Sequence, residues 1–233
     1  MIDKQRMVQT AQQYGIEIAH CIDQLDLYAQ MLVEYNEKVN LTAITDPKGI
    51  EEKHFLDSLL FATQPQVQGK LVDVGTGAGF PGIVAKLYKP ELQLTLMEPT
   101  GKRVEFLKFA CEGLGIQAEF VKERAEEAAR KQWREKFDVA SARAVAGLNI
   151  LSEYCLPLVK PEGWFIAMKA ADTTAEKAEA GGAIKKLGGK LQNTVETTLP
   201  DGSVRTLVMC KKISQTPPQY PRNGGKISKS PLK

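Results

Sequence analysis

The spacing of hydrophobic residues changes at about residue 66, and this change divides the chain into two parts. Before it, apolar residues recur every three or four positions from Ile18 to Val39, which predicts an amphipathic helix over about residues 17–39. Asp46 and Pro47 then form a typical helix start, with Asp46 as the cap and Pro47 as the first helical residue. We therefore interpret residues 1–66 as a helical cap on the domain that follows.

Between residues 67 and 213, short apolar runs alternate with helical patterns, which is typical of a parallel, doubly wound α/β sheet. Strands are predicted at residues 70–74, 92–97, 118–121, 137–140, 164–169, 190–199 and 204–213. Helices are predicted at residues 81–88, 101–113, 148–158 and 172–187. The turn Pro-Asp-Gly-Ser at 200–203 joins the last two strands so closely that they must run antiparallel. The prediction is a seven-stranded, mostly parallel, Rossmann-like sheet that ends in an antiparallel hairpin.

A dense group of glycines follows the first predicted strand, where residues 71–82 read LVDVGTGAGFPG. Because glycine has no Cβ and adopts positive φ readily, this backbone can turn sharply and lie against a ligand. Gly77 to Gly82 match the G-x-G-x-x-G pattern of dinucleotide sites. Asp73 with Gly75, Gly77 and Gly79 instead matches the loop of S-adenosylmethionine-dependent methyltransferases. In that loop the acidic group can hold the ammonium of the ligand directly or through water.

Two further features bear on the ligand. Glu98 ends the second predicted strand, where an acidic side chain can accept hydrogen bonds from the ribose of NAD or of S-adenosylmethionine. The C-terminal hairpin favours a methyltransferase, because a dinucleotide domain usually continues into a separate substrate domain. An NAD-dependent oxidoreductase is the alternative enzyme, and a non-catalytic RNA-binding protein on the same fold is the alternative outside enzymes.

The loop after the fourth strand, Ser141-Ala-Arg143-Ala, restricts the expected chemistry. It lacks the Asn-Pro-Pro-aromatic run that holds an exocyclic amine, and no Pro-Cys nucleophile for carbon methylation is evident. We therefore expect an acceptor that is already nucleophilic, such as a ring nitrogen, and no general base. Arg143 either forms a structural ion pair or positions the acceptor beside the methyl donor, which would make it the catalytic residue.

Composition narrows the class of protein. The chain has 233 residues, of which 43% are hydrophobic and 25% are charged, as expected for a soluble domain. The sequence has no signal-peptide core, no apolar run that could span a bilayer, and four scattered cysteines without a C-x-x-C pair. We therefore expect a cytoplasmic protein. With two histidines, a His/Cys metal site is not expected.

Positive charge is concentrated at the C-terminus, where residues 211–233 contain six basic and no acidic side chains. Because the whole chain has 31 basic and 28 acidic residues, the remainder is net negative. The segment is either a solvated, weakly ordered tail or an arm that neutralises phosphates. The candidate RNA contacts are Arg222, Lys226 and Lys229, with Lys102, Arg103 and Lys108 after the second strand. We expect the tail to lie away from the cofactor, so that deleting residues 222–233 leaves cofactor affinity unchanged.

The chain resembles the ribosomal RNA small subunit methyltransferase G family, also called RsmG or GidB. The matching stretches are YNEKVNLT at 35–42, HFLDSL at 54–59, DVGTGAGFPG at 73–82, GKRVEFL at 101–107, SARA at 141–144 and Tyr-Pro-Arg at 220–222. The resemblance covers almost the whole chain. It implies a class I methyltransferase that moves a methyl group from S-adenosylmethionine to N7 of a guanine in 16S rRNA, either as rRNA or in the small ribosomal subunit.

The resemblance also implies roles for single residues. Gly75 and Phe80 would line the cofactor site, Ala125 and Glu126 would contact the adenosine, and Arg143 would close the pocket. Glu98 stands where many members have Asp, and its longer side chain should still reach a ribose. The tail at 223–226, Asn-Gly-Gly-Lys, is less basic than the family pattern.

These arguments divide the chain into a cap (1–66), a methyltransferase domain (67–213) and a basic tail (214–233). The predicted cofactor contacts are Asp73, Gly75, Gly77, Gly79, Phe80, Glu98, Ala125, Glu126 and Arg143. His54 and Asp57 share a helix face and form either a structural pair or part of the substrate site. We expect a monomer that uses S-adenosylmethionine, has no metal and does not bind a membrane.

Overall fold

The structure is a computed structural model that describes residues 1–143, 146–170 and 173–233. Its strands are β1 (Lys70–Val74), β2 (Gln93–Met97), β3 (Ala118–Val121), β4 (Phe137–Arg143), β5 (Val159–Ala170), β6 (Gly189–Thr198) and β7 (Val204–Lys212). Its helices are α1 (Lys4–Gln13), α2 (Ile22–Asn36), α3 (Pro47–Gly49), the π-helix η1 (Ile50–Leu56), α4 (Asp57–Ala62), α5 (Gly82–Tyr88), α6 (Gly101–Gly113), α7 (Ala125–Ala128), α8 (Leu148–Cys155), the 3₁₀-helix η2 (Leu156–Leu158), α9 (Thr174–Lys186) and α10 (Gly224–Lys229). Ala144 and Asp172, which belong to predicted segments, lie outside the described residues.

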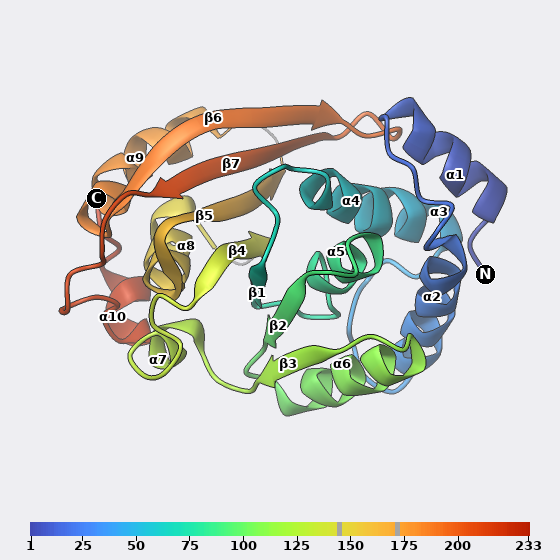
Figure 1. The fold of residues 1–233 in the computed structure, drawn as a ribbon, viewed down its shortest axis with the longest axis horizontal. Helices are drawn as coiled ribbons and strands as arrows, with labels where there is room; N and C mark the ends of the chain where they lie inside the picture. Colours follow the sequence, from blue (N-terminus) through green and yellow to red (C-terminus); the bar gives the residue numbers. More distant parts are fainter. Residues whose placement is uncertain (144–145, 171–172) are drawn as a thin grey trace.

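The seven strands form one sheet in the order β3-β2-β1-β4-β5-β7-β6 (Figure 1). Strands β1 to β5 are parallel, and β7 runs antiparallel to both β5 and β6. This confirms the predicted sheet with its C-terminal hairpin. The strand order reverses at β1, which has β2 on one side and β4 on the other, so the carboxyl ends of these three strands form the usual ligand edge.

Each face of the sheet is covered by its own set of helices. Successive side chains of a strand point to opposite faces, so neighbouring residues enter different cores. Leu71 belongs to a core shared with α1, α2, α4, α5 and α6, whereas Val72 belongs to a core shared with α7, α8 and α9. The sheet is therefore buried on both sides, as its near-continuous apolar strands require.

The N-terminal helices belong to the first of these cores, and they differ in part from the predicted cap. Helix α1 was not predicted, and α2 is shorter than the helix expected at residues 17–39. Ile18 and Cys21 are buried but lie before α2 begins, so their three-residue spacing resembles that of a helix without belonging to one. At the other end, the Asn36 side chain accepts hydrogen bonds from the backbone N–H groups of Leu41 and Thr42, at 2.8 and 3.0 Å, and so ends the helix.

The helix start at Asp46 is confirmed, since its carboxylate accepts a hydrogen bond from Gly49 N at 2.7 Å and Pro47 is the first helical residue. From there α3, η1 and α4 run without a break. The middle section has the wider π geometry, which is common at functional sites. This helix carries His54 and Asp57 to the carboxyl edge of the sheet.

The basic C-terminal segment is packed onto the domain. Figure 1 shows α10 beside α7 and α8, and Ile227 of α10 is fully buried. Near the end of the chain, Lys186 Nζ donates a hydrogen bond to the carbonyl of Lys233 at 3.1 Å. The segment therefore differs from a solvated, weakly ordered tail, because it buries apolar and polar groups of its own.

Candidate active site

The glycine loop after β1 depends on backbone conformations that favour glycine. Gly75, Gly77 and Gly79 have φ angles of 64°, 58° and 97°. A Cβ on Gly79 would lie 2.5 Å from Ile83 Cδ1 and 2.6 Å from Tyr28 Oη. Tyr28 also donates a hydrogen bond to the carbonyl of Ala78. The loop is thus held from the N-terminal helices as well as from the sheet.

Asp73 holds the loop from below. It is fully buried, and its Oδ2 accepts hydrogen bonds from Thr76 Oγ1 at 2.5 Å and from Gly82 N at 2.9 Å. Its Oδ1 accepts a hydrogen bond from Ser141 Oγ at 2.9 Å. Ser141 is the residue of β4 that pairs with Asp73 of β1 in the sheet. Burial raises the pKa of Asp73, and these hydrogen bonds oppose that rise. Both oxygens therefore join β1, the loop and β4.

Glu98, at the end of β2, contacts the same loop. Its side chain is buried, with Oε2 accepting from Gly77 N at 3.1 Å and Oε1 accepting from Thr100 N at 3.0 Å. Arg103 Nη1 lies 3.8 Å from Oε2 and forms an ion pair with it. Glu98 is therefore a buried carboxylate at the ligand edge.

A cavity of about 290 Å³ opens at the carboxyl ends of β1, β2 and β3. Its lining residues are Val74, Gly75, Met97, Pro99, Glu123, Arg124, Ala125, Glu126, Ala146, Ile150, Tyr154 and Ser228. Three predicted cofactor residues, Gly75, Ala125 and Glu126, thus share one cavity. Ser228 comes from α10, so the expectation that the tail lies away from this site is wrong.

The residues around this cavity fit S-adenosylmethionine. Gly77 has an open side, because a Cβ there would meet nothing closer than the Gly75 carbonyl at 4.0 Å. Met97 and Ile150 offer apolar walls suited to a flat adenine ring. Glu98 does not line the cavity itself, but it accepts a hydrogen bond from Gly77 N beside it and is a carboxylate of the kind that binds ribose hydroxyls.

A second cavity, of about 530 Å³, lies at the carboxyl ends of β4 and β5. It is lined by Ile44, Lys53, His54, Asp57, Arg143, Met168, Lys169, Ala170, Glu176 and Arg205. Asp57 lies 3.1 Å from Arg143 Nη1 and 3.4 Å from Arg205 Nε. Arg143 thus lines this second cavity and forms an ion pair there.

Phe80 connects the glycine loop with the second cavity. Its ring stacks on the His54 ring with the centroids 4.5 Å apart, and the Arg143 guanidinium lies 5.1 Å from its centroid. His54 contacts Thr42 Oγ1 through Nε2 at 3.0 Å, whereas Asp57 pairs with the two arginines. Thus His54 and Asp57 have separate partners and line the same cavity.

Burial and the charge of Arg143 shift the pKa values of His54 and Asp57 in the second cavity. Burial lowers the pKa of His54 to about 4, and the charge of Arg143 acts in the same direction, so its ring is neutral at pH 7. Burial raises the pKa of Asp57, whereas Arg143 and Arg205 act in the opposite direction. This cavity therefore combines a neutral imidazole with a paired carboxylate.

The predicted RNA contacts divide into exposed and paired side chains. Lys102, Lys108, Lys226 and Lys229 are exposed. Arg103 pairs with Glu98 as described, and Arg222 pairs with Glu153, with Nη2 lying 2.6 Å from Oε2. Arg222 is therefore already engaged within the fold.

Several residues at this edge were not singled out from the sequence. Arg205 lies on β7 and reaches Asp57 only because β7 joins the sheet beside β5. Ile150 and Tyr154 on α8 lack a motif, as does Ser228 on α10. For the C-terminal segment the sequence offers two signals: its six basic residues, which we interpret as an RNA contact, and the Tyr-Pro-Arg run at 220–222, which matches the family.

A larger groove, of about 620 Å³, lies at the opposite edge of the sheet. Its lining includes Lys70, Gln93 and Ala118, which begin β1, β2 and β3. Ligands of open α/β sheets bind at the carboxyl edge, so this groove is not the candidate site. Among the described residues, no His, Cys, Asp and Glu side chains gather in a group that could hold a metal ion. The helices at residues 1–143, 146–170 and 173–233 include none with the length and hydrophobicity of a membrane span.

The strand order and the glycine loop define a class I, Rossmann-like methyltransferase fold. A SAM-dependent O-methyltransferase from Thermotoga maritima has the same fold, with a TM-score of 0.52, 14% identity, and coverage of 80% of this chain and 72% of that one. The [4+2]-cyclase SpnF also matches, with a TM-score of 0.57, 12% identity, and coverage of 81% and 95%. Because a cyclase shares it, the fold alone does not determine the activity.

The particular family follows from sequence relatives. The profile of the GidB family, described as rRNA small subunit methyltransferase G, matches residues 21–205. A ribosomal RNA small subunit methyltransferase G from Alkaliphilus metalliredigens is 48% identical over 217 residues, covering 91% of each chain. Its counterpart from Lachnoclostridium phytofermentans is 43% identical over 238 residues, covering 100% of this chain and 98% of that one. This chain belongs to the ribosomal RNA small subunit methyltransferase G family.

Proposed function

We propose that the protein transfers a methyl group from S-adenosylmethionine to N7 of a guanine in 16S rRNA. The observation that carries this proposal is the pair of cavities at one sheet edge, in a chain of this family. The first cavity is lined in part by the start of the glycine loop, at Val74 and Gly75. The second cavity is lined by four basic and two acidic side chains. The comparisons lend no support to an NAD-dependent oxidoreductase or to a non-catalytic RNA-binding protein.

In this proposal the first cavity holds the cofactor. Gly75, Gly77, Ala125 and Glu126 contact it, and Glu98 accepts hydrogen bonds from its ribose. Asp73 acts indirectly, because both of its oxygens already accept hydrogen bonds that fix the loop. When bound, S-adenosylmethionine supplies the electrophilic methyl group of its sulfonium.

The second cavity holds the acceptor base. Guanine N7 carries a free lone pair, so no proton has to leave before it reacts and no general base is needed. The pKa of His54 is lowered to about 4, so its neutral ring is a weak base. This agrees with a site that positions the acceptor base and does not remove a proton from it. Correct orientation alone is worth roughly 7–11 kcal/mol of the barrier in well-aligned systems.

Arg143 is the residue that we expect to position the acceptor. Within the described part of the chain, its hydrogen bonds to Lys53 O and Asp57 Oδ2 are both donated by Nη1. A guanidinium has five N–H donors, so others are available for a base edge or a neighbouring phosphate. Its side chain is 18% exposed, which leaves it accessible from the cavity.

The RNA surface of this proposal consists of exposed lysines on two helices. Lys102 and Lys108 lie on α6, and Lys226 and Lys229 lie on α10. The proposal also includes a monomer that acts in the cytoplasm on 16S rRNA or on the small ribosomal subunit.

The test is methyl transfer with identification of the product. Purified protein is incubated with isotopically labelled S-adenosylmethionine and with small subunits or 16S rRNA from cells that lack the activity. Digestion and mass spectrometry should then detect labelled 7-methylguanosine. Label in another nucleoside would contradict the acceptor, and tight cofactor binding without label in either RNA would contradict the reaction.

A further inference from the structure

We propose that the C-terminal segment, defined as residues 214–230, forms one wall of the cofactor cavity and is required for tight cofactor binding. The inference rests on the proposed function, because it concerns the same cofactor. It assigns a role in the site to α10, which the sequence alone associated with RNA. Three sets of contacts support it.

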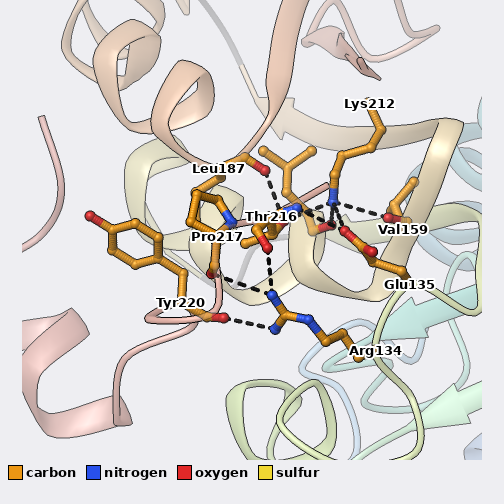
Figure 2. A network of polar contacts seen from close by, with 9 residues as sticks. Arg134, Glu135, Val159, Leu187, Lys212, Thr216, Pro217 and Tyr220 are labelled. Atoms are coloured by element: carbon orange, nitrogen blue, oxygen red, sulfur yellow. Dashed lines mark hydrogen bonds and ion pairs between the residues drawn. The ribbon is translucent and has the colours of Figure 1, made fainter. Parts of the chain in front are cut away.

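The first set fixes the segment as it leaves β7, around the buried ammonium of Lys212 (Figure 2). Lys212 Nζ donates to the carbonyls of Leu156 and Val159 at 2.6 and 3.0 Å, and to Thr216 Oγ1 at 2.8 Å. Glu135 Oε1 lies 3.2 Å from this ammonium and accepts from Thr216 N at 2.8 Å. Burial lowers the pKa of Lys212 to about 8, which Glu135 opposes.

The first set also includes two arginines, which hold the next turn of the segment. Arg134 donates to the carbonyls of Thr216 and Tyr220, at 2.6 and 2.8 Å, as Figure 2 shows. Arg130 Nε donates to the carbonyl of Pro221 at 2.9 Å. Both arginines follow α7, whose first residues line the cofactor cavity, so the segment is fixed directly to one side of that cavity.

The second set joins the segment to α8 through Arg222. Its Nε and Nη2 donate to Glu153 Oε1 and Oε2, at 2.9 and 2.6 Å, and its backbone N–H donates to Oε1 at 2.8 Å. The Glu153 side chain has no exposed surface, so Arg222 supplies the charge that this buried carboxylate requires. Ile150 and Tyr154 of the same helix line the cavity.

The third set is the contact with the cavity itself. Ser228 is one of the lining residues, and Ile227 beside it is fully buried. Gly224, the first residue of α10, packs so closely on Glu126 that a Cβ there would collide with Oε1. Glu126 is therefore held between the cavity and α10, and its position depends on that helix.

A matched pair of variants on α10 tests the inference. Gly224→Ala forces the Glu126 carboxylate to move, whereas Gly225→Ala makes the same change in composition where the nearest atom, Asn223 Oδ1, is 3.7 Å away. Calorimetric titration with S-adenosylmethionine should show at least about fivefold weaker binding for Gly224→Ala, and binding within about twofold of wild type for Gly225→Ala. Thermal melting of each variant checks that it is folded.

A chain that ends at Pro221 provides a second measurement. It should bind S-adenosylmethionine at least about tenfold more weakly, because the wall is missing. Wild-type affinity in a folded Gly224→Ala variant would overturn the inference, whether or not the shortened chain folds. Absence of methyl transfer by a wild-type protein that binds the cofactor would contradict only the proposed reaction, so the two failures are distinguishable.

Discussion

Glu98, directly after β2, supports the glycine loop in the structure, and we propose that it also binds the cofactor. It accepts backbone hydrogen bonds from Gly77 and Thr100, and in the proposed function it also accepts from the ribose hydroxyls. Hydrogen bonds to a charged group are worth about 1.5–3 kcal/mol, so Glu98→Ala should weaken S-adenosylmethionine binding roughly 10- to 150-fold. Calorimetry on the purified variant measures this directly.

Glu98→Gln is the matched control, because it keeps the size and one acceptor oxygen but loses the charge. We expect its affinity to lie between those of the wild type and Glu98→Ala. A loss below about threefold for Glu98→Ala would mean that the carboxylate only supports the loop.

Arg143 is expected to affect turnover more than cofactor affinity, because it lines the second cavity. Misplacing an acceptor by about 1 Å can cost on the order of 100-fold in rate, and we expect a loss of that order in kcat for Arg143→Ala. The Kd for S-adenosylmethionine should stay within about threefold of wild type. Single-turnover kinetics and calorimetry on one preparation separate the two quantities.

Arg205→Ala is the comparison for Arg143→Ala, since each removes one of the two cationic partners of Asp57. If Arg143 only neutralises Asp57, both variants should lose the same fraction of activity. Equal losses of turnover and cofactor affinity in Arg143→Ala would instead assign this residue to the cofactor.

Residues near one motif were predictable, whereas residues brought together by folding were not. The glycine loop and Glu98 could be identified because each directly follows a recognisable strand. Arg205 could not, because its contact with Asp57 joins two positions far apart in sequence. The motif predicts that Asp73 holds the ammonium of the ligand directly or through water, and no observation tests this. Hydrogen bonds from Ser141 and Gly82 to its two oxygens instead support the indirect role that we propose.

The continuous helix from α3 to α4 shows what a capping signal can and cannot predict. Asp46 and Pro47 indicate where the helix begins, because a side-chain cap and a proline at the first position are local features. The π geometry of η1 has no comparable local signal. His54 lies in η1 and Asp57 directly after it, so the neighbours that they meet in the second cavity are visible only in the structure.

Helix α10 combines the proposed cavity wall with two exposed lysines, and these roles are separable. A Lys226→Ala/Lys229→Ala double variant should bind 16S rRNA more weakly, because each neutralised phosphate releases counterions. The slope of log affinity against log salt should become shallower by about one for each lysine that binds a phosphate, or about two in total. Affinity for S-adenosylmethionine should be unchanged, since neither lysine is among the residues that line the cofactor cavity.

A Lys38→Ala/Lys190→Ala double variant removes the same charge at exposed positions elsewhere, in the turn after α2 and on β6. It should leave the salt slope unchanged. Identical slopes for both double variants and the wild type would show that α10 does not contact RNA. The lysines of α6 would then be the next candidates.

The whole molecule brings distant parts of the chain to one edge of a single sheet. The parallel order of β1, β2 and β4 was predictable from alternating strands and helices, and it places residues 73, 98 and 143 at the same edge. The position of the C-terminal segment was not predictable in this way. It depends on buried pairs such as Arg222 with Glu153, whose partners carry no spacing signal in the sequence.

The central claim is that the glycine-loop cavity binds the methyl donor for N7 of an rRNA guanine. The most direct measurement is single-turnover transfer of labelled methyl from S-adenosylmethionine to 16S rRNA or small subunits, comparing the wild type with a folded Gly75→Val variant. A branched side chain at this left-handed position, with φ of 64°, places bulk against the ligand. The account predicts labelled 7-methylguanosine with the wild type and loss of both cofactor binding and label with the variant. Transfer at the wild-type rate by folded Gly75→Val, or no 7-methylguanosine from the wild type with either RNA, would contradict it.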